Sequence, residues 1–585
     1  MRKNRTHQSF IITLLLIVLL LMPLWGIRSS AHRTEDASES GPMISPAGVL
    51  VLDATTRQPA VGSLPVDFVR SPDHLGPDGG GRYLVSVNSG FGIQFNAAGN
   101  RGQQSLSLID LNVKPAPLVV QNVYFPSPQS VNVGVVFSNT PDPDGSHQMF
   151  VSGGFENKIW IFRFMPGSMT PITPAAAGNA AGIEAPFIDV KGFTGTAPSP
   201  RYNDNQAPVY PTGLAISPDG NNLYVANNLG DSLGIVKDIR GSRTLERISL
   251  PGKTPGLKSH FTYPYAVVAI PHGPQGARDP RDSVLLSPGQ SQSSAAAQRG
   301  DPAALTAKVY VSCWNDSSVA VINFAVKENV VKYISVGQHP TAMLWDGSRS
   351  LLFVANSGDD SVSVIDTRYD RELERINVRL REDAPLGNTP EGLALSGNTL
   401  YVANAHSNSV AVVRLSKRAR NGISSPATDG KEERDAENDR SEVRGFIPTG
   451  SYPSAVSFAA HQIFIGNGKG TGVEPSSVVV NGSGRAPNTP NDRFPAGTGR
   501  GSKQGGQYSV SLVTGNISMV NEPDDRQLAT YTQQVMGNDF WRYGVDESRH
   551  EIEALCQYLH EQGLTDRRVS VEELFVPATM DMSKV

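Results

Sequence analysis

The sequence predicts an all-β protein, a seven-bladed β-propeller of four-stranded blades with a short helical C-terminal tail. Two observations support this fold class: a phrase of apolar and β-branched residues that returns along the chain, and a high content of turn-forming residues, with 57 glycines and 42 prolines among 585 residues. Short strands divided by turns are typical of all-β proteins, and a returning unit of this size indicates blades around one axis.

The repeat is clearest between residues 211 and 236. Pro211 opens a first strand that runs to a Pro-Asp-Gly turn at 218–220, the second strand reads Leu-Tyr-Val-Ala-Asn at 223–227, and the third reads Ser-Leu-Gly-Ile-Val at 232–236. Proline presets φ and glycine accepts the left-handed conformation, so the turn follows from its residue types. The unit is therefore a meander of short strands.

The same three segments return after Pro340 and Pro390, and residues 372–378 add a fourth, more polar strand that suits the outer edge of a blade. More divergent copies complete the set, and the proline that opens each unit is called its lead proline here. The seven lead prolines are Pro65, Pro128, Pro211, Pro264, Pro340, Pro390 and Pro453. Seven units lie within the usual range of about 4–8 blades for closed propellers.

A closed ring has to join its two ends. Residues 49–53 read as a strand that precedes the first lead proline, and we expect this strand to complete the last blade. The third strand of that blade is expected at 508–513. The propeller is predicted to span 45–523, with loop insertions at 271–307, 415–445 and 468–507.

The N-terminus carries an export signal. Three basic residues precede an apolar run over 10–27, and small residues follow at 29–31. This pattern predicts a signal peptide over 1–31 that is cleaved after Ala31, followed by a disordered linker over 32–44. The protein is then periplasmic or secreted; the alternative is an uncleaved N-terminal membrane anchor, because about 18 apolar residues can span a bilayer.

Composition limits the function further. The formal net charge of -4 provides no basic field for nucleic acid, and two cysteines cannot build a disulfide framework. Neither a Gly-x-Ser-x-Gly elbow nor a His-Glu-x-x-His helix occurs, and His339, His406 and His461 lack the local spacing of a metal site. We therefore expect no catalytic residue, no metal and no cofactor.

Two stretches with the Leu-(Phe/Tyr)-Val-Ala-Asn phrase, 352–366 and 400–413, resemble the YVTN-type, YncE-like β-propeller repeat family. Residues 466–470 and 525–532 are similar to the junction of exported proteins in which such a propeller is joined to an alkaline-phosphatase-type phosphoesterase. That resemblance implies an alternative function, the propeller part of a split or truncated metal-dependent phosphoesterase that acts with a hydrolase domain in trans. No catalytic residue carries over.

The C-terminal segment 524–585 is expected to be helical. Its phrases at 536–541 and 572–575 are similar to the C-terminus of dihydroxyphthalate-decarboxylase-like and solute-binding proteins.

Two helices are expected within this tail. Apolar residues with helical spacing lie between Ile552 and Leu559, and Gly563 is placed to end that helix. Ser570 and Glu573 form a capping box for a second, shorter helix.

Ligand specificity on a repeat scaffold belongs at positions where the repeats differ. The residue after each lead proline varies between blades, starting with Val66 in the first, and is expected at the mouth of the central channel. The candidate ligand-binding residues are Gln129, Thr212, Tyr265, Thr341, Glu391 and Ser454. The alternative is that they are ordinary exposed turn residues.

One position repeats instead of varying. An asparagine ends the second strand of five blades, and its recurrence favours a structural role in which the side chain bonds its own backbone at the turn. These structural turn asparagines are Asn88, Asn227, Asn356, Asn404 and Asn467.

The sequence thus predicts an exported, non-catalytic, monomeric binding or scaffold protein. Its partner is an unknown protein, glycan or small molecule. Contact with a membrane is expected only if the N-terminal segment stays uncleaved.

Overall fold

The computed structural model describes residues 46–59, 61–62, 64–90, 104–125, 129–174, 185–192, 194–195, 209–253, 261–272, 306–325, 331–381, 384–416, 419, 440–470, 515–536, 549, 552–553, 556–557, 560 and 565–574. These residues belong to one compact unit, Ile44–Val585, which is distinct from Met1–Met43. The expected signal peptide and linker lie outside the described residues, as do most of the three insertions and the segment 508–513.

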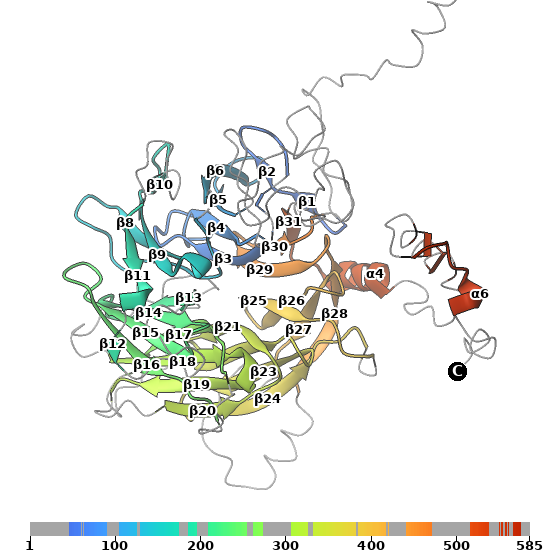
Figure 1. Cartoon of the computed structure of the whole chain (residues 1–585). Coiled ribbons are helices and arrows are strands. Elements are labelled where there is room, and N and C mark those ends of the chain that lie inside the picture. The colour runs from blue at the N-terminus through green and yellow to red at the C-terminus, as the bar shows by residue number, and fades with distance from the viewer. Residues whose placement is uncertain are drawn as a thin grey trace, which may run out of the picture. The chain divides into compact units, whose positions relative to one another are not determined.

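Seven sheets, each a four-stranded meander, form the blades of a β-propeller (Figure 1). The first three blades carry short additional strands. Blade 1 contains β3 (Pro65–Arg70), β4 (Tyr83–Asn88), β5 (Ser105–Asp110), β6 (Leu118–Tyr124) and the added β2 (Leu52–Asp53); blade 2 contains β7 (Val135–Phe137), β8 (His147–Ser152), β9 (Lys158–Phe164), β10 (Ile172–Thr173) and the added β11 (Phe187–Asp189); blade 3 contains β13 (Pro211–Ile216), β14 (Asn222–Asn227), β15 (Ser232–Lys237), β16 (Thr244–Ser249) and the added β12 (Thr194–Gly195).

Blades 4 to 6 follow the plain four-stranded pattern, and blade 7 takes its fourth strand from the N-terminal side of the chain. Blade 4 contains β17 (Pro264–His272), β18 (Thr306–Cys313), β19 (Ser318–Asn323) and β20 (Val331–Ser335); blade 5 contains β21 (Pro340–Asp346), β22 (Leu351–Asn356), β23 (Ser361–Asp366) and β24 (Arg371–Asn377); blade 6 contains β25 (Pro390–Ser396), β26 (Thr399–Asn404), β27 (Ser409–Arg414) and β28 (Glu442–Pro448); blade 7 contains β29 (Pro453–Ala459), β30 (Gln462–Asn467), β31 (Asn516–Asn521) and β1 (Val49–Leu50).

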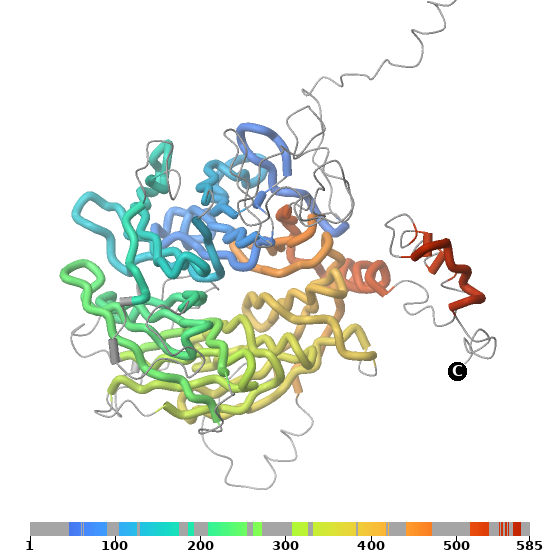
Figure 2. Tube along the Cα trace, in the orientation of Figure 1, coloured from blue at the N-terminus to red at the C-terminus, as the bar shows by residue number. Residues whose placement is uncertain are grey.

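The ring closes through the predicted N-terminal strand. Val49 and Leu50 of β1 pair antiparallel with Met519 and Ser518 of β31, and the Val51 N–H donates to Ile517 O at 2.9 Å. The first and last blades therefore lie side by side, as the blue and orange parts of the tube in Figure 2 show. The closing-strand prediction is confirmed for Val49 and Leu50 alone, because Leu52 and Asp53 form β2, which pairs with β6 of blade 1. The expected third strand of blade 7 is wrong: β31 pairs with β30, and residues 508–513 lie outside the described residues.

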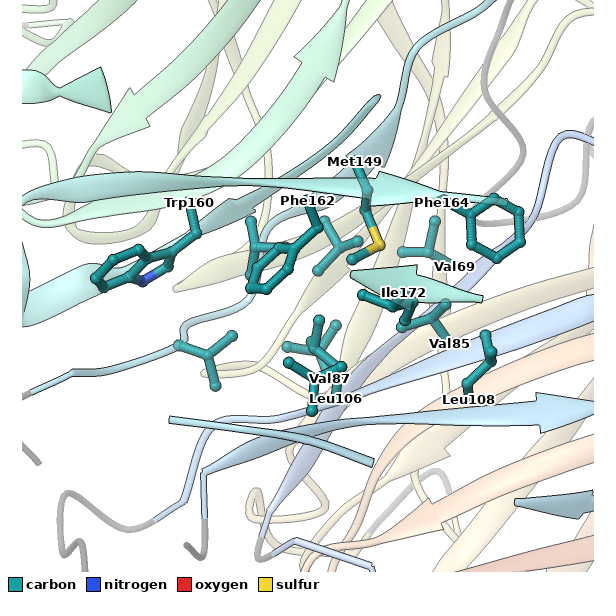
Figure 3. Close-up of a cluster of buried hydrophobic side chains, with 14 of the residues drawn as sticks. Val69, Val85, Val87, Leu106, Leu108, Met149, Trp160, Phe162, Phe164 and Ile172 are labelled. Atoms are coloured by element: carbon teal, nitrogen blue, oxygen red, sulfur yellow. The ribbon is translucent and has the colours of Figure 1, made fainter. Parts of the chain in front are cut away.

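The hydrophobic core lies between blades. Leu84 of β4 packs toward blade 7, whereas the next residue, Val85, packs toward blade 2, where Figure 3 shows it with Met149 and Phe162. Successive side chains of a strand point to opposite faces, and both faces of a blade are covered here. This is why the second strands read as unbroken apolar runs rather than as alternating ones.

Among the described residues after the last strand, two helices have defined bounds. The helix α4 (Asp525–Met536) begins after Asp524, whose carboxylate accepts from the Gln527 N–H, and α6 (Val571–Leu574) begins after Ser570, whose N–H donates to Glu573 Oε2 at 2.9 Å. The latter bond is one half of the expected capping box. In the part of the chain that is described, no helix is long and apolar enough to cross a membrane.

Candidate functional site

The inner strands of the blades begin at one end of the propeller axis. At this end a lead proline pairs with the last residue of the second strand, and the register shifts directly after it. The described pairs are Pro65 with Asn88, Pro211 with Asn227, Pro264 with Cys313, Pro340 with Asn356, Pro390 with Asn404 and Pro453 with Asn467.

The residue before the lead proline adopts a left-handed backbone with φ between 49° and 61°. The residues with this conformation are Leu64, Tyr210, Tyr263, His339, Thr389 and Tyr452. A residue before proline normally prefers extended backbone, and a left-handed non-glycine residue costs roughly 1 kcal/mol or more. Other contacts must hold these residues in place.

Four of them are held by a side chain of the preceding blade. In each case the backbone N–H of the left-handed residue donates to the side chain of an Asn or Asp at 2.8–3.1 Å. This Asn or Asp is itself left-handed and directly precedes a third strand. The pairs are Asn157 with Tyr210, Asp231 with Tyr263, Asp360 with Thr389 and Asn408 with Tyr452. These blade clasps fix the left-handed residues and link neighbouring blades.

The candidate residues after the lead prolines fall into two groups. In the first group, the hydroxyls of Thr212 and Ser454 donate to the lead-proline carbonyls of the next blade, Pro264 and Pro65. The Thr341 hydroxyl donates to a carbonyl within its own blade. All three side chains are buried, and their hydroxyls already serve the scaffold.

Gln129 is also buried, but it does not occupy the equivalent position in blade 2. In blade 2, Val135 pairs with Val151, and in blade 3 the equivalent Leu214 pairs with Val225. Thr212 lies two residues before Leu214, so its equivalent in blade 2 is Val133. The blade 2 chain enters its inner strand four residues later than the sequence pattern suggested.

The second group is more exposed. Tyr265 and Glu391 are only partly buried, and so is Asp67, the second residue after the first lead proline. Asp67 was not among the sequence candidates, although a signal for it exists. The equivalent residue is small in the other blades: Gly134, Gly213, Ala266, Ala342, Gly392 and Ala455.

Small residues suit this position because neighbouring inner strands approach closely. A Cβ on Gly213 would lie 2.6 Å from Tyr265 O, and one on Gly392 would lie 2.9 Å from the Cα of Ala455. An aspartate at the same place in blade 1 is therefore an exception to the packing rule of the ring.

Burial acts strongly on the two carboxyl groups. It raises the pKa of Asp67 from 3.8 to about 7, against the opposing effect of a hydrogen bond from the Phe68 N–H, and it raises the pKa of Glu391 from 4.5 to about 7. Both side chains keep some solvent contact.

Tyr265 connects the two carboxyls electrostatically. Burial is the largest cause of its raised pKa, and the charges of Glu391 and Asp67, then Tyr452 and Tyr210, raise it further. The pKa of Tyr452 is also raised by burial and by Glu391. Four side chains from four other blades thus act on Tyr265, and we call Asp67, Tyr210, Tyr265, Glu391 and Tyr452 the axis cluster.

Aromatic contacts extend outward from this cluster. The Tyr452 ring meets His406 edge-on at 5.3 Å, and the ammonium of Lys469 lies 4.7 Å from its centroid. In blades 4 and 5, Trp314 stacks on His339 with centroids 3.9 Å apart. The two histidines pack against aromatic rings, and no group of three or more His, Cys, Asp or Glu among the described residues is placed to hold a metal ion.

The turn asparagines are fully buried and lie away from this chemistry. Asn88 and Asn356 each donate from Nδ2 to two serine hydroxyls of the following strand, Asn227 donates to Ser232, and Asn467 donates to Ser518. The expected bond to their own backbone at the turn is not the one formed. These four asparagines instead tie the second strand of a blade to its third, whereas Asn404 donates to Val378 O, directly after the fourth strand of blade 5.

No protein-family model matches the chain. Among curated proteins, 4,5-dihydroxyphthalate decarboxylase of Comamonas testosteroni is 38% identical over 53 residues, which are 9% of this chain and 16% of that protein. The chain therefore spans about one sixth of the length of this relative.

Similar solved structures include virginiamycin B lyase from Staphylococcus aureus, with 12% identity, coverage of 71% of this chain and 94% of that one, and a TM-score of 0.37. The periplasmic gluconolactonase of Pseudomonas aeruginosa has 15% identity, coverage of 64% and 88%, and a TM-score of 0.38. Hydrazine synthase of Kuenenia stuttgartiensis has 16% identity, coverage of 71% and 95%, and a TM-score of 0.40. Likeness at this level says nothing about activity, and it is the seven paired sheets that establish the β-propeller fold.

Proposed function

We propose that this protein is an exported β-propeller of the YVTN type that binds a small ligand at the axis cluster without transforming it. The observation that carries the proposal is that Asp67, Tyr265 and Glu391, from three blades, are all partly exposed and all have a pKa raised by burial. The two carboxyls and two further tyrosines also raise the pKa of Tyr265. The basic and apolar N-terminal segment supports export, and the repeated second-strand phrase supports the repeat type.

The rigidity of the surroundings favours a binding role. The clasp from Asn157 fixes the backbone of Tyr210, and the clasp from Asn408 fixes that of Tyr452. Backbone held in this way loses little conformational entropy when a ligand arrives, which is one part of preorganised recognition. Ligand sites usually draw a few polar groups from several elements, as these residues come from several blades.

A second candidate is proton-transfer catalysis at the same place. Its specific support is that Asp67 and Glu391 both have a pKa of about 7, which suits exchange of protons near neutral pH. Ligand binding and catalysis would use the same residues, so the test has to follow both the ligand and its products.

The test is ligand-observed NMR with the purified mature protein and a small-molecule extract of the periplasm. We expect bound compounds whose signals weaken with wild type and recover with Tyr265→Ala, while Met169→Ala, a fully exposed side chain, behaves like wild type. Equal binding to the Tyr265→Ala protein would disprove the proposed site. Conversion of a bound compound over time would establish the catalytic candidate in its place.

A further inference from the structure

We infer that four blades each hold one buried water molecule at the Oδ1 atom of the turn asparagine. The inference goes beyond the proposed function and does not depend on it, because it concerns the interior of the blades. It is carried by a hydrogen-bond acceptor that has no donor at the same position of four blades and receives a bond from a serine in a fifth.

The four acceptors lie at the ends of second strands. Each side chain is fully buried, and its Oδ1 atom has no hydrogen-bond partner among the described residues; the four are Asn227, Asn356, Asn404 and Asn467. Buried polar atoms in folded proteins are almost always bonded to protein or to ordered water, because an unmatched one is costly. The recurrence of the same atom in four blades calls for one common partner.

Blade 1 contains the donor that the other four blades lack. Ser86 Oγ donates to Asn88 Oδ1 at 2.9 Å. The two residues lie two positions apart on one strand, so their side chains point to the same face. The equivalent residues of the other four blades are apolar and buried: Val225, Val354, Val402 and Ile465. Their side chains carry no donor, so the second strand cannot supply the bond.

The chain beside the asparagine does not supply a side chain either in blades 5 and 7. A Cβ on Gly337 would lie 2.6 Å from Asn356 Cγ, and one on Gly450 would lie 2.7 Å from Asn467 Cγ. Bare backbone therefore passes the amide at both places. A water molecule is a donor small enough to reach an acceptor in such surroundings, and buried waters typically bond polar groups that would otherwise lack a partner.

Reversing the amide groups does not remove the unmatched atom. In blade 6 the Asn404 Nδ2 donates to Val378 O at 2.8 Å, and a carbonyl oxygen can only accept, so this orientation is fixed. In blades 3, 5 and 7 the Nδ2 atoms bond serine hydroxyls, and a reversal would place Nδ2 where no partner lies. Water serves either orientation because it both donates and accepts.

The experiment exchanges the two arrangements in the full mature protein. Val354→Ser gives blade 5 the serine of blade 1, and Ser86→Val gives blade 1 the valine of blade 5. A high-resolution crystal structure of wild type is expected to show a water about 2.5–3.0 Å from Oδ1 in blades 3, 5, 6 and 7 and none at Asn88 Oδ1. Val354→Ser should lose the water at Asn356, and Ser86→Val should gain one at Asn88.

Magnetic relaxation dispersion of the water signal counts long-lived internal waters in solution. The count should fall by one in Val354→Ser and rise by one in Ser86→Val. Val225→Ser repeats the first exchange in blade 3. The matched control is Val120→Ser, the same change at an exposed position, which should leave the count unchanged.

The wild-type crystal structure decides the question by itself if a variant fails to fold. A protein donor bonded to these Oδ1 atoms, or the lack of a water at all four of them, would overturn the inference. An unchanged water count in both Val354→Ser and Val225→Ser would overturn it as well.

Discussion

Asn408 of blade 6 holds Tyr452 of blade 7 through a 2.8 Å hydrogen bond from the Tyr452 N–H to Asn408 Oδ1. Both residues are left-handed, with φ of 49° and 61°. Left-handed backbone is tolerated best by glycine and next by asparagine and aspartate. Asparagine can therefore adopt the left-handed conformation and also accept a hydrogen bond from the next blade through its side chain. In blade 7 this bond fixes the backbone of Tyr452, a member of the axis cluster.

Replacing Asn408 separates these two roles. Asn408→Gly keeps the backbone conformation and removes the acceptor, so we expect it to lower the free energy of unfolding by about 1 kcal/mol. Asn408→Ala also adds the strain of a left-handed alanine, so its free energy of unfolding should be roughly 2 kcal/mol below that of wild type. Asn408→Asp keeps an acceptor and should unfold close to wild type. Urea unfolding curves measure all three, and equal stability of the glycine variant and wild type would show that the clasp contributes nothing.

The buried carboxyl of Asp67 makes stability depend on pH. Its pKa is about 7 in the folded protein and 3.8 without burial, so between these values the folded state binds more protons than the unfolded state. Stability contributed by the protonated form is present below pH 4 and is lost as the pH rises to about 7. Asp67→Asn should thus be more stable than wild type at pH 8, by about 1–3 kcal/mol after allowance for its partial exposure, and similar to it at pH 4.

The measurement is the melting temperature of both proteins from pH 4 to pH 8. Asp566→Asn serves as the control for replacing an aspartate by asparagine, because Asp566 is exposed. A constant difference between Asp67→Asn and wild type over the whole range would contradict a buried carboxyl on the axis.

The helix α4 docks on the outer strand of blade 6. Thr532 Oγ1 accepts the Phe446 N–H of β28 at 2.9 Å and donates to Leu528 O at 2.8 Å, and Leu528 is buried in the core between blades 6 and 7. Gly445 allows this approach, since a Cβ there would lie within 3 Å of Leu528 Cγ.

Thr532→Val has nearly the same shape as threonine but leaves the Phe446 N–H without its acceptor. We expect a loss of about 1–3 kcal/mol in unfolding free energy and faster hydrogen exchange at Phe446. The matched control is Thr530→Val, which removes only an exposed hydroxyl that bonds Arg526 O in the same helix. If both variants exchange alike at Phe446, α4 does not rest on β28 in solution.

The fold could be predicted from the sequence because each blade repeats one local pattern. The second strands must be apolar on both faces, so phrases such as 400–404 stand out, and the unmatched strand at 49–53 had one place left in a closed ring. The third strand of blade 7 was misplaced because 508–513 and 516–521 both alternate serine or asparagine with apolar residues. Only pairing with β30 distinguishes the two segments. Pairing depends on residues far apart in the chain, so the local pattern could not predict it.

The site could be predicted only in part. Variation after the lead prolines identified Tyr265 and Glu391, but the same rule selected Thr212 and Ser454, whose hydroxyls bond the neighbouring blade. A hydroxyl that binds a ligand and one that binds a carbonyl read alike in sequence. Asp67 could have been found by comparing the second position after each lead proline, where the other blades have glycine or alanine.

Ring closure gives the last prediction. Val51 lies between the first and last blades, almost completely buried, and its N–H donates to Ile517 O. Val51→Ala would leave a cavity in a core cluster that joins the two ends of the described propeller, and it should lower the free energy of unfolding by about 2 kcal/mol. Ser454→Ala removes the hydroxyl that donates to Pro65 O across the same seam and should lower it by about 1 kcal/mol. Because both changes act on one seam, the double variant should also expose residues 49–53 to limited proteolysis.

The equivalent seam inside the ring provides the control. Thr212→Ala loses the bond from blade 3 to Pro264 O, but the chain itself runs from blade 3 to blade 4. Proteolysis at 49–53 should therefore stay at the wild-type level in this variant. Cleavage at 49–53 that is equally fast in the Thr212 variant would mean that the N-terminal strand does not lock the ring.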